Sequence, residues 1–329
     1  MLVITCLYSF LRFWHSFCPD LYMKNRIWTV FSLLVVQHCF SQNTICFSPP
    51  QVFPNSFGPC RSLVTADFNN DGLPDFCTQS DGIFLLLSNG LGSYTFSSNI
   101  TPGNVYIDAI LTQDFNNDGD ADVAGISSQD SSVFIFIGNG LGNMSSTNSF
   151  SVQSDSKSLI AADFNNDNKM DLATANYYTN TISIFLGNGN GSFLTAINYS
   201  VPNNTSLIIA GDFNNNAALD IFVFTSGSSV ILKGTGNGTF SVTSNFTVQA
   251  DAALTAKLNN DNYPDLVSVN GSTLSVRLGN GNYGFGSPMN YPLNGSSGSG
   301  ESVTMADFNN DSKSDLAVTL NDRIFILQS

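Results

Sequence analysis

The chain has 329 residues, a formal net charge of −14, and 42% apolar but only 11% charged residues. This apolar content excludes a disordered chain, and so few Lys and Glu residues are untypical of a helical protein. Nucleic acid is excluded as a partner, because no basic patch would neutralise its phosphates. We therefore expect a packed all-β protein that is rich in turns.

The N-terminal residues have the pattern of a secretory signal. From Met23, a basic start with Lys24 and Arg26 precedes an apolar run over 27–36 and small residues near 41. We expect residues 1–22 to be an N-terminal extension, residues 23–41 a signal peptide, and residues 42–329 a secreted protein with no membrane span. The alternative is a signal-anchor helix that holds the chain at a membrane.

Removal of this leader changes the chemistry of the mature chain. His15 and His38 are the only histidines, so the mature chain has no imidazole for catalysis or for zinc and haem ligation. N-glycosylation sequons agree with an exported glycoprotein; they begin at Asn99, Asn143, Asn190, Asn198, Asn203, Asn204, Asn237, Asn245, Asn270, Asn294 and Asn310.

Three cysteines follow the leader, namely Cys46, Cys60 and Cys77. An odd number leaves one of them free or paired with another molecule. We favour a Cys46–Cys60 disulfide, which would tie the mature N-terminus to the first repeat and close a short loop.

An acidic loop recurs six times, at 67–75, 114–122, 163–171, 212–220, 257–265 and 307–315. The loops start 47, 49, 49, 45 and 50 residues apart, so they mark an internal repeat. Runs rich in β-branched and aromatic residues flank each loop, as at 63–66 and 171–175, and predict strands. A third run, such as 182–186, ends in a Gly-Asn-Gly turn, and a fourth begins at Phe193.

Four strands per repeat predict a six-bladed β-propeller over residues 42–329. The sixth repeat ends at Ser329, before a fourth strand. Residues 47–54 resemble the fourth-strand segment 193–202, so we expect an N-terminal strand to complete the last blade and remove two sheet edges.

The loops contain 17 of the 25 acidic residues, and carboxylates gathered in this way repel one another unless a cation is near. Side chains at positions one, three, five and nine and a carbonyl at seven present hard oxygen donors at the spacing of an EF-hand, which favours calcium. The alternative is a set of Asx-turns that need no metal. The candidate ligands in repeats one, two, three and six are Asp67, Asn69, Asp71, Leu73, Asp75, Asp114, Asn116, Asp118, Asp120, Asp122, Asp163, Asn165, Asp167, Lys169, Asp171, Asp307, Asn309, Asp311, Lys313 and Asp315.

Repeats four and five depart from this pattern. Repeat four has Asn216 and Ala217 at positions five and six, and repeat five has Lys257 at position one, where an ammonium can replace the ion. We expect four good calcium sites, one marginal site and one empty site. The weaker candidate ligands are Asp212, Asn214, Asn216, Asp220, Asn259, Asp261 and Asp265.

The Asp-Phe-Asn loop followed by a Gly-Asn-Gly-x-Gly-x-Phe turn resembles the FG-GAP/VCBS repeat. That repeat is the blade of integrin α-subunit propellers and of several secreted lectin-like propellers, and the resemblance spans Phe47 to Ser329. It implies calcium with a structural role and a ligand bound on a propeller face or between blades. The departures at Asn216 and Lys257 weaken this inference for two of the loops.

For function, we expect a non-catalytic extracellular module that binds a glycan or a protein. Tyr177 and Tyr178 are the candidate contacts, because exposed aromatic rings stack on sugars or anchor interfaces; ordinary packing is the alternative for each ring. A second hypothesis is a carboxylate-based glycosidase or lyase, which needs no histidine. Its candidate residues are Asp81, Asp108, Asp130, Asp155, Asp251, Glu301 and Asp322. A third is a structural or adhesive surface protein assembled through Cys77 or another free thiol.

Overall fold

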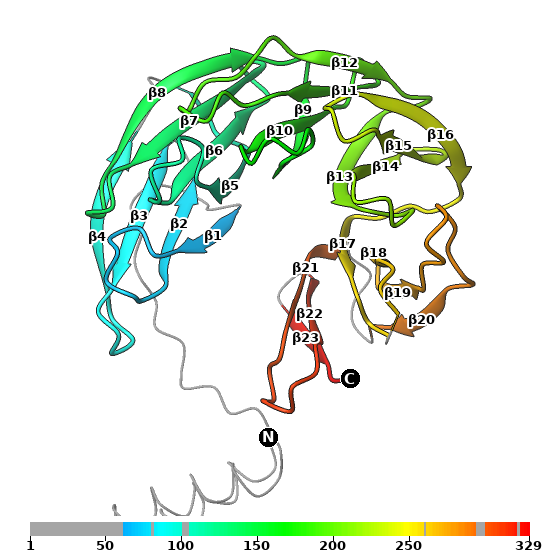
Figure 1. Ribbon diagram of the computed structural model, residues 1–329. Coiled ribbons are helices and arrows are strands. Elements are labelled where there is room, and N and C mark those ends of the chain that lie inside the picture. Colours follow the sequence, from blue (N-terminus) through cyan, green and yellow to red (C-terminus); the bar gives the residue numbers. More distant parts are fainter. Residues whose placement is uncertain (1–61, 80–81, 101–104, 260, 294–299, 321–322) are drawn as a thin grey trace, which may run out of the picture. The chain divides into compact units, whose positions relative to one another are not determined.

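The computed structural model describes residues 62–79, 82–100, 105–259, 261–293, 300–320 and 323–329. The chain divides into two compact units, residues 1–53 with 307–313 and residues 54–306 with 314–329. The 23 strands of the described residues all belong to the second unit (Figure 1). The predicted leader, the Cys46–Cys60 pair and the strand at 47–54 lie outside the described residues.

The second unit is an all-β propeller of six antiparallel sheets, or blades. Blades one to three contain β1 (Leu63–Ala66), β2 (Asp75–Gln79), β3 (Ile83–Ser88), β4 (Tyr94–Ile100), β5 (Ala109–Gln113), β6 (Asp122–Ser127), β7 (Ser132–Gly138), β8 (Met144–Ser151), β9 (Ser156–Ala162), β10 (Asp171–Asn176), β11 (Thr181–Phe185) and β12 (Ile197–Ser200). Blades four to six contain β13 (Thr205–Gly211), β14 (Asp220–Thr225), β15 (Ser229–Gly234), β16 (Phe240–Phe246), β17 (Ala252–Ala256), β18 (Asp265–Asn270), β19 (Thr273–Arg277), β20 (Met289–Pro292), β21 (Gly300–Ala306), β22 (Asp315–Leu320) and β23 (Arg323–Leu327).

Within each blade the strands pair in chain order, which confirms the predicted meander of four strands in five blades. The sixth blade has three strands among the described residues. The first strands lie side by side from blade to blade, in the order β1, β5, β9, β13, β17 and β21. Each acidic loop joins the first strand of a blade to the second, as the repeat predicts.

The second strands are the most buried part of the fold. Every residue of β6, β10 and β14 is buried, because blades cover both faces of these strands. A strand buried on both faces has a nearly continuous apolar sequence rather than an alternating one, as in Asp220–Thr225. The carboxylate that begins each second strand therefore enters the protein interior.

The fourth strand of blade three begins later than the sequence predicts. β12 starts at Ile197 and not at Phe193, which makes only an isolated bridge with Gly187. The ring of Phe193 turns inward and packs edge-to-face against Phe115 and Phe150. The backbone then leaves the ladder for three residues, 194–196, before β12 begins.

Candidate functional site

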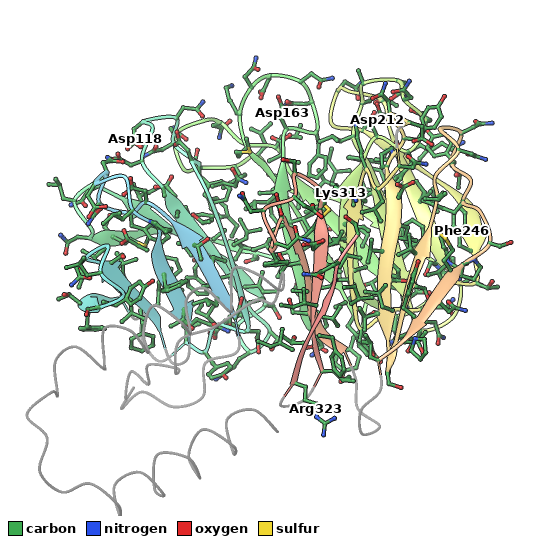
Figure 2. The ribbon with its side chains drawn as sticks, turned by 90° about the horizontal axis from the view of Figure 1, so that it is seen from below. Asp118, Asp163, Asp212, Phe246, Lys313 and Arg323 are labelled. Carbon is green, nitrogen blue, oxygen red and sulfur yellow. The ribbon has the colours of Figure 1, made fainter. Side chains whose placement is uncertain are left out.

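The acidic loops of the second unit lie at one end of the blades. Figure 2 shows Asp118, Asp163 and Asp212, from three successive loops, along one edge of the molecule, and Arg323, which begins β23, at the opposite end. Each loop of this unit connects the first strand of a blade to the second, so all of these loops lie at the same end of their blades.

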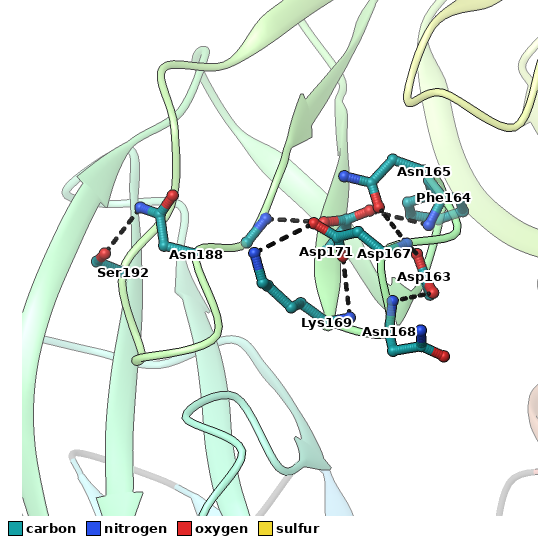
Figure 3. A network of polar contacts seen from close by, with 10 residues as sticks. Asp163, Phe164, Asn165, Asp167, Asn168, Lys169, Asp171, Asn188 and Ser192 are labelled. Carbon is teal, nitrogen blue, oxygen red and sulfur yellow. Dashed lines mark hydrogen bonds and ion pairs between the residues drawn. The ribbon is translucent and has the colours of Figure 1, made fainter.

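The third loop shows how the first seven positions fold (Figure 3). The two carboxylate oxygens of Asp163 accept the backbone N–H groups of Asp167 and Asn168 at 3.1 and 2.7 Å. Asn165 Oδ1 also accepts from Asp167 N, at 3.0 Å, and Asp167 Oδ1 accepts from Lys169 N at 3.0 Å. These are Asx-turn contacts, in which short polar side chains satisfy the backbone of a tight loop. Asn168 takes a φ of 61°, which Asn tolerates better than most residues.

The other loops repeat this arrangement with small differences. Loops one, two and four and the loop of the first unit, 307–313, share the contacts from positions one, three and five. Loop five has Lys257 at position one, and its Asp261 N–H bonds Asn259 Oδ1 at 3.1 Å. The loops therefore have the geometry of Asx-turns, which their own hydrogen bonds close. This is the alternative that the sequence left open.

Position nine has a separate, structural role. Asp171 has no exposed surface, and its two oxygens accept the N–H groups of Phe164 at 2.8 Å and Gly187 at 2.7 Å. It thus joins the acidic loop to the turn after the third strand (Figure 3). Burial raises the pKa of Asp171 to about 6, against the opposing effect of these two N–H groups.

The same pair of contacts recurs at position nine of loops one, two, four and five. Asp315, in the second unit, accepts the N–H of Ser329 at 2.9 Å. Burial also raises the pKa of Asp122 and of Asp220 to about 6. In loops one to five, backbone N–H groups bond both oxygens of the position-nine carboxylate, so its burial does not require a bound metal.

The chemistry of the exposed loop positions suits a hard divalent cation. In every loop except loop five, positions one, three and five supply carboxylate and amide oxygens only, and each oxygen retains a lone pair after accepting one N–H. Across the part of the chain that the structure describes, no three carboxylates, imidazoles or thiols lie close enough together to hold a metal ion. A cation at these loops would therefore be held by positions one, three, five and seven. The buried carboxylate at position nine would hold the backbone of the loop in place.

The loops also join neighbouring blades, which the sequence reasoning did not find. The carbonyl of Phe115, at position two of loop two, accepts the N–H of Gly191 in the next blade at 2.9 Å. The ring of Phe115 packs against Phe193, with centroids 6.0 Å apart. Equivalent ring pairs join Phe164 to Phe240 and Phe213 to Phe285.

The contacts between two neighbouring blades are called a joint below. The ring pairs explain why the repeat motif contains two Phe residues at three of these joints. The Phe of the acidic loop and the Phe that closes the following Gly-Asn-Gly turn belong to different blades and meet between them. The two Phe residues recur at a constant spacing in the repeat, and this recurrence was the signal in the sequence. The sequence alone does not show that the contact is made between two repeats and not within one.

The candidate ligand contacts lie in the turn between β10 and β11. Tyr178 is 69% exposed, and its ring stands edge-to-face with Tyr177 at a centroid distance of 5.3 Å. The backbone N–H of Tyr177 bonds Asp155 O at 3.0 Å. The Asp155 carboxylate in turn lies 2.8 Å from Lys157 Nζ. The structure therefore places the two tyrosines together and leaves one ring open to solvent.

Two of the carboxylates considered for glycosidase chemistry accept nearby backbone N–H groups. Asp108 Oδ2 accepts Ser128 N at 2.7 Å, and Asp251 Oδ2 accepts Gly271 N at 2.8 Å. Asp81, Asp322 and the side chain of Glu301 lie outside the described part of the chain.

Cys77 has no exposed surface, and burial raises the pKa of its thiol well above the usual range. The folded blade therefore keeps this thiol from pairing with another molecule. Among the described residues, no helix is long and apolar enough to cross a membrane.

Solved structures share this fold at low sequence identity. A lectin of Agrocybe aegerita, described for its recognition of non-reducing terminal N-acetylglucosamine, is 17% identical with a TM-score of 0.56, over 81% of this chain and 79% of the lectin. BBS1N, solved in complex with ARL6DN, is 13% identical with a TM-score of 0.56, over 82% and 79%. A mutant of AofleA from Arthrobotrys oligospora is 15% identical with a TM-score of 0.52, over 81% and 82%. No curated protein matches the sequence significantly.

A family model agrees with the internal repeats. The FG-GAP-like repeat matches residues 67–125, 114–174, 163–223 and 257–318, which together make up more than half of the chain. Each match begins at an acidic loop and runs on into the acidic loop of the next blade. With its blades, loops and joints in place, this chain belongs to the FG-GAP-like repeat family.

Proposed function

We propose that the chain is a non-catalytic extracellular module that binds glycans, with the propeller as a rigid scaffold. The observation that carries the proposal is the pair Tyr177 and Tyr178, whose second ring is 69% exposed. An exposed aromatic face stacks on the apolar face of a sugar ring. The lectin of similar fold suggests which sugar to try first, N-acetylglucosamine. Export rests on the signal-like residues 23–41, and a protein ligand is the alternative partner.

The backbone beneath the tyrosines supports this role because it is held rigidly. Asn176, directly before them, has no exposed surface; its Oδ1 accepts Ser156 Oγ at 2.7 Å and its Nδ2 donates to Ser183 Oγ at 2.8 Å. Buried, fully satisfied polar networks fix local geometry. A preorganised aromatic surface loses little conformational entropy on binding.

A glycan array, read with calcium present, tests the proposal. The secreted protein is expected to bind glycans that end in N-acetylglucosamine, and Tyr177→Ala with Tyr178→Ala to lose at least tenfold in affinity. Tyr291→Ala is the matched control, because Tyr291 is also exposed, at 43%, but lies on β20 of another blade. Undiminished binding by the double variant would contradict the tyrosine site. Binding to no glycan, together with capture of a protein ligand that needs both tyrosines, would replace the glycan.

We propose further that calcium binds loops one, two, three and six and stabilises their turns. The support is the donor chemistry, because two or more carboxylates and an amide oxygen lie on each short loop with lone pairs left for a hard cation. Calcium would offset the repulsion among these carboxylates, which the loops otherwise balance with N–H groups of the backbone and of Asn side chains and, in loop three, with the ammonium of Lys169.

Thermal unfolding with and without chelator tests the calcium proposal. A ligand at 100 times its Kd stabilises a single site by about 2.7 kcal/mol, so several sites predict a rise in Tm of many degrees. Magnesium at equal concentration is the control for ionic strength. A Tm that is the same in calcium and in chelator contradicts the proposal, while the glycan assay is read independently.

A further inference from the structure

The joint between blades four and five departs from the other joints in a coordinated way. At three joints, the third Gly of the turn donates its N–H to the Phe carbonyl of the preceding blade, from Gly142, Gly191 and Gly238. At the fourth joint the donor is Tyr283, whose N–H bonds Phe213 O at 3.0 Å. Tyr283 keeps the left-handed backbone of the glycines, with a φ of 58°. A bulky residue in this region is strained, which calls for a compensating contact.

The residue of the preceding blade that packs against this turn position also differs at the fourth joint. A Cβ at Gly142 would meet Leu87 Cδ1 at 2.5 Å, and a Cβ at Gly238 would meet Leu186 Cδ2 at 2.7 Å. The residue that corresponds to Leu87 and Leu186 at the fourth joint is Lys233, directly before the N–H donor to the position-nine carboxylate. The usual contact of Leu or Ile with Gly has thus become a Lys–Tyr contact, in which an unbranched side chain leaves room for the ring.

This Lys–Tyr pair brings a positive charge to loop four. Lys233 Nζ lies over the ring of Tyr283, 4.1 Å from its centroid, which is a cation–π contact. The Tyr283 hydroxyl accepts a hydrogen bond from Asn214 Nδ2. In most other loops, the amide at this position donates to the position-five carboxylate instead, as Asn69 does to Asp71.

Loop four is also the loop with the weakest case for a metal. It has Asn216 in place of the position-five carboxylate, so Asp212 and Asp220 are its only acidic groups. Burial raises the pKa of Asp220, and the charge of Lys233 is among the influences that lower it. The buried carboxylates Asp122 and Asp171 have no such cation among their influences.

We propose that the ammonium of Lys233, held over the ring of Tyr283, is a built-in cation for loop four, so that this joint needs no metal. Three departures from the repeat, at positions 216, 233 and 283, then have one explanation. The Lys–Tyr pair stands on its own geometry, whereas the contrast with metal-binding loops rests on the proposed role of calcium.

A double-mutant cycle in chelator tests the pair. Lys233→Met keeps the length of the side chain and removes its charge, and Tyr283→Gly restores the residue of the other joints. Each single change is expected to lower Tm by about 2–4 °C, and the double change by clearly less than the sum. Lys157→Met is the matched control, because Lys157 forms a surface ion pair outside the acidic loops, at 2.8 Å from Asp155, and its loss should leave Tm nearly unchanged. Additive losses, or a Lys233→Met variant as stable as the natural protein, overturn the proposal.

Calcium alone is the probe for the second measurement. Asn216→Asp restores the missing carboxylate and is made both in the natural chain and together with Lys233→Met. Calcium is expected to raise Tm further only in the second case, where no internal cation compensates the new charge. An equal gain in both backgrounds overturns the proposal. If calcium raises the Tm of no protein in the series, the calcium role fails, and the cycle in chelator still decides the pair.

Discussion

At the scale of single residues, burial separates carboxylates that the repeat motif treats alike. Asp163 and Asp171 open and close the same loop, yet the first is partly exposed and the second has no exposed surface. Spacing alone made both of them candidate ligands. Position nine accepts hydrogen bonds in the protein interior because it begins the second strand, which is buried on both faces. The local sequence pattern does not predict that burial.

Asp171→Asn is expected to destabilise the protein in chelator by about 2 kcal/mol. An amide has one acceptor oxygen, so one of the two N–H donors, Phe164 or Gly187, loses its partner and faces another donor. Urea unfolding measures the change. Asp167→Asn is the control on the same loop, because an amide oxygen can still accept from Lys169, and its effect should appear only with calcium. Equal losses in chelator would contradict the structural role of position nine.

At the scale of elements, the turns after the third strands form the joints between blades. The second Gly of such a turn, Gly140, faces a hydrogen bond between blades, from Asn70 Nδ2 to Asp120 Oδ1 at 2.7 Å. A Cβ at Gly140 would lie 2.4 Å from both of these atoms. The glycine is therefore required by the neighbouring blade as well as by its own φ of 63°.

Gly140→Ala and Gly92→Ala separate these two requirements. Both glycines have positive φ, but a Cβ at Gly92 meets nothing within 4 Å. Gly92→Ala should cost about 1 kcal/mol from the backbone alone, and Gly140→Ala about 1 kcal/mol more, because Asn70 and Asp120 must separate. Denaturant midpoints measure both. Equal costs would show that the contact between blades adds nothing.

The aromatic pair at three of the joints gives a second prediction at this scale. Phe115→Ala should cost about 3–5 kcal/mol, since Phe115 is 1% exposed and packs against Phe193. Phe115→Leu should cost much less, because repeat five carries Leu258 at this position. Urea unfolding compares the two variants. A leucine as harmful as alanine would mean that ring stacking, and not apolar volume, holds the joint.

The sequence predicts the elements better than the joints between them. Strand β1 falls on the predicted residues 63–66, and six acidic loops mark six blades, because local spacing and turn chemistry encode both. The late start of β12 and the Lys233–Tyr283 contact were missed. Both depend on side chains that meet across tens of residues of sequence, which only the folded chain brings together.

At the scale of the whole molecule, the apolar cores lie between blades rather than within them. The core around Phe68 unites residues of blades one and two, and the core around Phe222 unites blades four and five. Three more cores join blades two and three, three and four, and five and six. Opening one blade therefore exposes the apolar surface of its neighbours, which favours cooperative unfolding.

Cys77 can report this cooperativity, because its thiol is buried in blade one. In a chain with Cys46→Ser and Cys60→Ser, iodoacetamide should label Cys77 only when blade one opens. Phe222→Ala, in the distant core of blades four and five, removes about 3–5 kcal/mol. At tenfold per 1.4 kcal/mol, a single cooperative transition predicts labelling at least about a hundredfold faster. Phe222→Leu should give an intermediate rate; labelling unchanged in both variants would show that the blades open independently.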